Sequence, residues 1–160
     1  MTEEELVKVL GEKRAKCPDC GAKIDEQHVL GCDIERCPRC GNQPIGCSCI
    51  YVVCGMDYDK LEEEHPDIYV GGPTSEMVER WLKEWGERRM KWSGWWPGEV
   101  DAVELGFWSC WGPDMDPPRQ GWVRVKAGTP GAGPRLNELM ENTDWDPETQ
   151  RRVLRGKGDA

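Results

Sequence analysis

The sequence predicts an α+β protein in two parts, a small cysteine-rich module followed by a small domain in which a helix packs on an antiparallel hairpin or sheet. Eight of the nine cysteines lie within residues 17–54. Further along, residues 77–85 repeat apolar side chains at helical spacing, and residues 121–127 alternate as a strand does. We therefore expect a module at 1–54, an acidic linker at 55–73 and a tryptophan-rich α+β domain at 74–160.

The cysteine-rich module contains two Cys-Pro-x-Cys-Gly units separated by sixteen residues, and their thiols are Cys17, Cys20, Cys37 and Cys40. Paired Cys-x-x-Cys turns at this spacing are typical of a structural Zn²⁺ site, in which each turn supplies two sulfurs to a tetrahedral ion. Disulfides are the competing interpretation. The acidic start of the chain does not resemble a secretory signal, which favours metal. We expect these four thiolates to bind one zinc ion.

Four more candidate ligands surround the second unit: His28, Cys32, Cys47 and Cys49. Taken in order, the ligands form four pairs. The first and third pairs could hold one zinc and the second and fourth another, which would be an interleaved cross-brace. Alternatively, the module is a zinc ribbon with one ion, in which the remaining cysteines are spare thiols. Both interpretations remain open.

Further helices and strands are predicted from local patterns. Thr2 and Glu5 form a capping-box pattern that begins a helix over 2–10. Residues 50–53 are β-branched or aromatic and predict a strand. Thr74 or Ser75 begins the clearest helix, which runs to about residue 90. Strands are expected over 100–111 and 121–127, and short helices over 136–141 and 147–154.

The composition limits both the core and the partners. Hydrophobic residues make up 38% of the chain with one Phe, so the nine Trp must supply much of the buried apolar area. The net charge is −9, and residues 1–73 carry 8 basic and 15 acidic groups. Nucleic acid requires a basic surface, which is lacking beside the cysteines. No apolar run is long enough for a membrane span, so we expect a cytoplasmic protein without a membrane partner.

Several blocks resemble a family of small bacterial zinc-ribbon proteins with a tryptophan-rich C-terminal region. The blocks are the first Cys-Pro-x-Cys unit, residues 31–41, Cys47-Ser48-Cys49, residues 92–98, residues 121–123 and residues 135–139. This resemblance covers most of the chain. It implies zinc binding and a cytoplasmic origin, and it implies no activity.

Fully thiolate knuckles leave no open metal position for a reactive water, so we expect no enzyme activity. Trp92, Trp95 and Trp96 lie in a Gly- and Pro-broken loop and are the candidate partner-binding residues, because Trp is frequent at interface hot spots. We therefore expect a non-enzymatic zinc-binding protein that acts as a regulatory module binding another protein. The alternative is association with nucleic acid or the transcription machinery, including acidic inhibition of a nucleic-acid enzyme.

Overall fold

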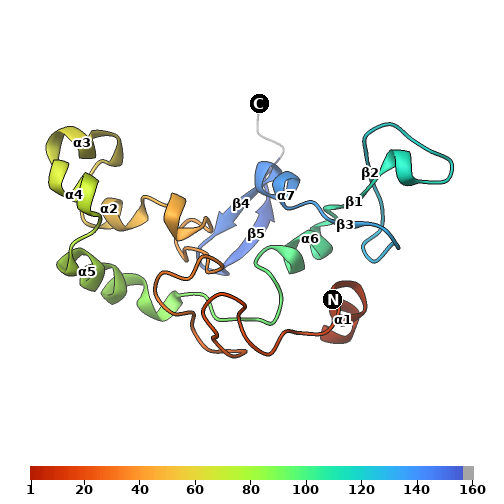
Figure 1. Cartoon of the computed structure of the whole chain (residues 1–160), viewed down its shortest axis with the longest axis horizontal. Coiled ribbons are helices and arrows are strands. Elements are labelled where there is room, and N and C mark those ends of the chain that lie inside the picture. The colour runs from red at the N-terminus through yellow and green to blue at the C-terminus, as the bar shows by residue number, and fades with distance from the viewer. Residues whose placement is uncertain (157–160) are drawn as a thin grey trace.

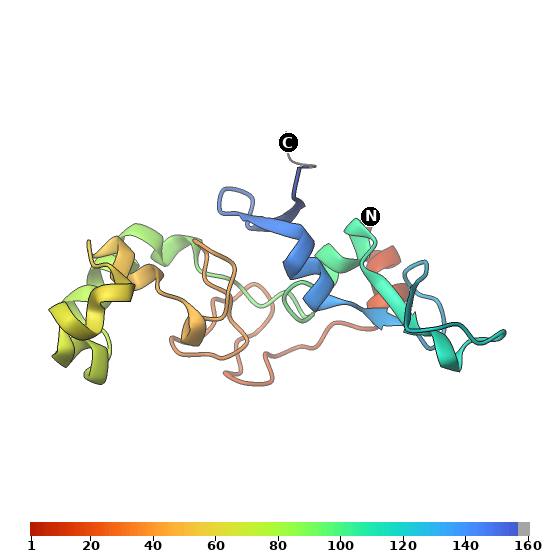
Figure 2. The ribbon, with the colours of Figure 1, turned by 90° about the horizontal axis from the view of Figure 1, so that it is seen from above.

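The computed structural model describes residues 1–156, and they form an elongated molecule (Figures 1 and 2). One end is helical and contains α2 to α5. The other end contains a small sheet with α1 and α6. The metal-ligand loops and a second hairpin lie between the two ends. The elements are α1 (Glu3–Leu10), α2 (Cys49–Val53), α3 (Leu61–Glu64), α4 (Pro66–Gly71), α5 (Ser75–Trp85), α6 (Glu99–Leu105), β1 (Trp108–Trp111), β2 (Trp122–Arg124), β3 (Gly133–Pro134), α7 (Leu136–Asn142), β4 (Thr143–Asp146) and β5 (Arg151–Leu154).

Helices α1 and α5 begin where the sequence predicts them. The Glu5 amide donates to the Thr2 hydroxyl at 3.2 Å, and the Thr2 amide donates to the Glu5 carboxylate at 2.7 Å, which is the predicted capping box. Thr74 caps α5 by accepting from the Met77 amide. Both helices end at or near a glycine, Gly11 and Gly86.

Two antiparallel sheets are present in the described part of the chain. Strand β1 pairs with β2 on one side and β3 on the other, with Cys110 opposite Val123 and Trp108 opposite Pro134. Strands β4 and β5 form a separate hairpin. The structure thus has helices and small antiparallel sheets, as expected of an α+β protein.

Several predicted elements differ in the structure. Residues 50–53 belong to helix α2 and form no strand, residues 99–105 form helix α6, and residues 147–154 form a turn and strand β5 where a helix was expected. The segment 55–73, expected to be an acidic linker, contains α3 and α4. Helix α5 packs against α2, and the helices at the three-stranded sheet are α6 and α1.

The buried core combines residues from both predicted parts. Leu6 of α1 packs with Trp95, Val103 and Trp108. Trp92 packs with Cys17, Ala22, Cys32 and Ile34 of the cysteine-rich segment. Two buried clusters therefore mix residues of 1–54 with residues of 74–160, and a third, Ala102, Phe107 and Leu139, lies wholly within 74–160. Among the described residues, no helix combines the length and apolarity that a membrane crossing requires.

Candidate metal centres

The eight candidate ligands gather into two clusters of four. Centre 1 consists of Cys17, Cys20, His28 and Cys32, and centre 2 consists of Cys37, Cys40, Cys47 and Cys49. Within each cluster the ligand atoms lie within 4.8 Å of one another. Each Cys-x-x-Cys pair is therefore completed by the ligand pair that follows it directly in the sequence.

This grouping corrects the expected assignment. Cys17 and Cys20 do not share a cluster with Cys37 and Cys40, and His28 and Cys32 do not share one with Cys47 and Cys49. The cross-brace is thus not formed. The single ribbon with spare thiols is not formed either, because all eight atoms are gathered in fours. The order of ligands along the chain is compatible with both pairings, so only the path of the loops distinguishes them.

The ligand spacings fit zinc. Bonds of about 2.3 Å to sulfur and about 2.0–2.1 Å to nitrogen place tetrahedral sulfurs about 3.8 Å apart, and sulfur and nitrogen about 3.5 Å apart. The Sγ atoms of Cys17 and Cys32 are 3.8 Å apart, and those of Cys40 and Cys47 are 3.5 Å apart. His28 Nδ1 lies 3.5 Å from Cys20 Sγ and 3.3 Å from Cys32 Sγ. All nine cysteines are unbridged, which excludes the disulfide interpretation for this structure.

The two Cys-x-x-Cys turns have the same local geometry. The amide of Gly21 donates to the Cys17 carbonyl at 2.9 Å, and that of Gly41 donates to the Cys37 carbonyl at 2.8 Å. Both glycines have positive φ, 77° and 74°, which the chain needs to turn away from the sulfurs. The Cys-Pro-x-Cys-Gly pattern therefore forms the expected knuckle twice.

Centre 1 is bound to the segment that follows α5. His28 is buried, and its ring meets the Trp92 ring edge to face at 6.0 Å. Arg89 donates to the His28 carbonyl at 2.8 Å and to both carboxylate oxygens of Glu35 at 2.9 Å. The buried ion pair thus fixes the backbone of the ligand loop. Burial lowers the pKa of His28, which favours the neutral imidazole that a metal requires.

Centre 2 has its own supporting contacts. The amide of Cys49 donates to Cys47 Sγ at 3.3 Å, and Arg39 Nη1 donates to Cys49 Sγ at 3.3 Å. The hydrogen bond between Cys37 and Cys40 lowers the pKa of Cys40 and raises that of Cys37, so the thiolate charge is shared unevenly within the cluster. Donors and cations beside sulfur stabilise thiolate, the form that binds metal. From the C-terminal hairpin, Trp145 Nε1 donates to the Pro38 carbonyl at 2.8 Å.

The candidate partner-binding loop is mostly buried. Trp92 is 1% exposed and donates from Nε1 to the Arg14 carbonyl at 2.8 Å, and Trp95 is also buried and donates to the Gly11 carbonyl at 3.0 Å. Trp96, at 38% exposure, is the one of the three that reaches the surface. The expectation that all three face a partner is therefore wrong for Trp92 and Trp95, which complete the core beneath centre 1 and α1.

No sequence motif indicates the residues that support the two centres, such as Arg89, Glu35 and Trp145. Each of them contacts a segment that is distant in the sequence. Comparison of the chain with family models, with curated proteins and with solved structures finds no match. The geometry alone therefore carries the assignment of these clusters as sites able to hold metal ions.

Proposed function

We propose that the chain is a non-enzymatic protein that binds two structural zinc ions and acts as an interaction module for another protein. The observation that carries the proposal is the pair of four-ligand clusters. A site with four protein ligands leaves no coordination position for water or substrate, which is the arrangement of structural zinc. Three of the ligands in centre 1 are thiols and all four in centre 2 are, and such soft donors select zinc among common divalent ions.

The zinc assignment is tested by native mass spectrometry of pairs of Cys→Ser substitutions. We expect two zinc ions per wild-type chain. Cys17→Ser with Cys32→Ser alters centre 1 alone and should leave one ion, whereas Cys17→Ser with Cys37→Ser alters both centres and should leave none. An interleaved arrangement predicts the opposite result: the Cys17→Ser, Cys32→Ser variant would lose both ions, and the Cys17→Ser, Cys37→Ser variant would keep one. A wild-type chain that contains no zinc after expression in zinc-supplemented medium would contradict the proposal.

Support for an interaction role comes from the helical end of the molecule. Val70 of α4 is 85% exposed, and Tyr69 of the same helix, Tyr58 and Val52 are exposed as well. Tyrosine is enriched among the residues that dominate interface energies, and exposed apolar side chains that gather on one surface often mark an interaction site. The acidic composition disfavours the alternative partner, nucleic acid.

The interaction role is tested with the immobilised zinc-loaded chain and extracts of the cells that produce it. We expect a protein to be retained by wild type and lost when Tyr69→Ser and Val70→Ser are combined. Leu154→Ser, at an exposed apolar position of β5, is the matched control and should retain it. Retention that disappears after nuclease treatment would instead favour a nucleic-acid partner.

A further inference from the structure

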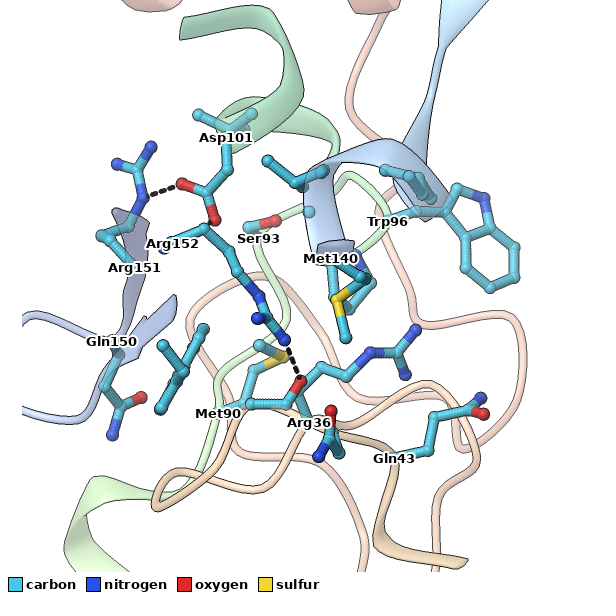
Figure 3. Close-up of a pocket in the computed structure, with 18 of the residues that line it drawn as sticks. Arg36, Gln43, Met90, Ser93, Trp96, Asp101, Met140, Gln150, Arg151 and Arg152 are labelled. Carbon is cyan, nitrogen blue, oxygen red and sulfur yellow. Dashed lines mark hydrogen bonds and ion pairs between the residues drawn. The ribbon is translucent and has the colours of Figure 1, made fainter. Parts of the chain in front are cut away.

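A cavity of about 760 Å³ lies between centre 2 and the C-terminal hairpin (Figure 3). Its walls come from the loop of the second knuckle, the segment 90–98, α7 and β5. This volume falls within the range of about 300–1,000 Å³ that small-molecule sites occupy. No role in metal binding or in the proposed interaction uses this space.

Two guanidinium groups in the cavity form no ion pair with the part of the chain that the structure describes. Arg151, on the same wall, pairs with Asp101 and Glu104. Arg36 and Arg152 also reach into the cavity (Figure 3), yet within the described residues no carboxylate oxygen lies within 4.0 Å of either guanidinium. The shortest contact of Arg36 Nη1 is 3.0 Å, to the Ile34 carbonyl, and Arg152 Nη2 reaches the Gly41 carbonyl at 3.5 Å. Neither guanidinium therefore has a carboxylate in direct contact among the described residues, although Asp101 and Asp144 attract Arg152 from a greater distance.

This placement is unusual in a chain with a net charge of −9. Arg36 and Arg152 line the same cavity, so their two positive charges repel each other across it. Arginine remains protonated at physiological pH, so this repulsion is not relieved by loss of a proton. An oxyanion between the groups would relieve it, because a guanidinium fork matches the oxygens of phosphate or carboxylate.

The rest of the cavity is suited to the uncharged part of an organic ligand that carries this anionic group. Met140 and Trp96 provide apolar surface, and the side-chain amides of Gln43, Asn137 and Gln150 provide donors and acceptors. In Figure 3 Met140 lies beside the guanidinium of Arg36. A mostly apolar wall with a few polar groups is the usual composition of a ligand site.

We infer that this cavity binds a small organic anion whose phosphate or carboxylate lies between Arg36 and Arg152 and whose flat, apolar portion lies against Met140 and Trp96. Both arginines also lie close to centre 2, since Arg36 directly precedes Cys37 and Arg152 donates to the carbonyl of Gly41, which follows Cys40. The two arginines could serve only to neutralise the negative charge of the thiolates. That role alone would not require a cavity of this size or the side-chain amides in its walls. The experiment below separates the two roles.

The test is calorimetry and ligand-detected NMR on the zinc-loaded full-length chain. The probes are inorganic phosphate, the nucleoside 5′-monophosphates, and aromatic carboxylates of similar size. We expect at least one organic probe to bind with a Kd of about 1 mM or tighter, and more tightly than inorganic phosphate. Comparison of the phosphate probes with the carboxylate probes identifies the anionic group that the site prefers.

Arg36→Gln and Arg152→Gln should each weaken binding by about tenfold or more. Met140→Trp should block the apolar portion while leaving both charges in place. Arg80→Gln, on the exposed face of α5, is the control and should leave the Kd unchanged. Zinc content and circular dichroism establish that each variant is folded. The inference is overturned if no organic probe binds the folded wild type, if inorganic phosphate binds as tightly as the organic probes, or if Arg80→Gln weakens binding as much as the cavity variants.

Discussion

Among single side chains, the ion pair of Glu35 and Arg89 joins the ligand loops to the segment after α5. Glu35 is 4% exposed, and Arg89 occupies both of its carboxylate oxygens. A buried ion pair often stabilises a protein no more than apolar residues of similar volume would. Removal of one partner alone, however, leaves an uncompensated buried charge, which is strongly destabilising. The arginine also donates to the carbonyl of the ligand His28.

We expect Arg89→Ala to lower the free energy of unfolding by about 3–5 kcal/mol, because Glu35 would remain buried without its partner. Arg89→Lys should be partly destabilising, since an ammonium cannot reproduce the two-pronged bond. Chemical denaturation at saturating zinc measures both. Arg80→Ala, which breaks only an exposed pair with Glu84, is the control and should change stability by no more than about 1 kcal/mol. Equal effects of the Arg89 and Arg80 substitutions would show that the buried pair is unimportant.

The identity of the ligands could be predicted from the sequence, because only a few residue types bind soft metal ions and their local spacing fixes the knuckles. Their partition could not. His28 lies eight residues after Cys20 and nine before Cys37, so spacing hardly favours either knuckle, and only the loop path brings its Nδ1 to Cys20 and Cys32. The burial of Trp92 depends equally on a distant segment, since the carbonyl that accepts its indole N–H belongs to Arg14.

Between elements, the contact of the second knuckle with β4 distinguishes two otherwise identical turns. A Cβ added at Gly41 would lie 2.5–2.8 Å from three atoms of the Trp145 ring, whereas one added at Gly21 would meet nothing within 4 Å. Both positions have positive φ, so the strain that an Ala side chain adds to the backbone is shared by the two substitutions.

Gly41→Ala should therefore destabilise the protein by about 1–3 kcal/mol more than Gly21→Ala, because it also displaces Trp145. Thermal unfolding at fixed zinc gives the difference, and the NMR signal of the Trp145 indole N–H reports the displacement directly. If the two alanine variants are equally stable, β4 does not pack on the second knuckle as described.

The elements that the sequence predicts well are those with complete local signals. Helix α1 has both halves of a capping box, and α5 has a cap and a helical apolar repeat. Helix α6 was missed although Gly98 and Gly106, both with positive φ, bracket it and Glu99 and Asp101 lie in its first turn. Strand β5 follows a turn in which Asp146 accepts from the Glu148 amide and the Thr149 hydroxyl, a signal that competes with helix at 147–154. In α2, packing against α5 outweighs the preference of the β-branched residues for a strand.

Across the whole chain, the shared core has a consequence for fragments. A fragment beginning at Gly71 would retain Trp92 and Trp95 but would lose the carbonyls of Arg14 and Gly11 and the side chain of Leu6. Each buried indole N–H left without an acceptor costs about 1–3 kcal/mol. We expect this fragment to lack protected amides in hydrogen exchange and a cooperative unfolding transition. A cooperative fragment would show that the part from residue 74 onward folds alone.

Removal of metal should also disturb the core residues that pack on centre 1. Trp92 packs on Cys17 and Cys32, so chelation of zinc from centre 1 should expose its indole and shift tryptophan fluorescence to longer wavelength. Trp92→Phe should reduce that shift, whereas Trp122→Phe, at an exposed position far from the ligands, should not. An unchanged spectrum after complete zinc loss would contradict the coupling.

The consecutive arrangement of the two centres also bears on how the chain would acquire metal ions. The ligands of centre 1 all fall within 17–32 and those of centre 2 within 37–49, so neither site must wait for a sulfur of the other. Short loops cost little entropy to close, and an interleaved pairing would have required longer ones. During synthesis on the ribosome, each ion would therefore be able to bind as soon as its own segment has emerged. Trp92, which packs on Cys17 and Cys32, would then meet a centre 1 that already holds its ion.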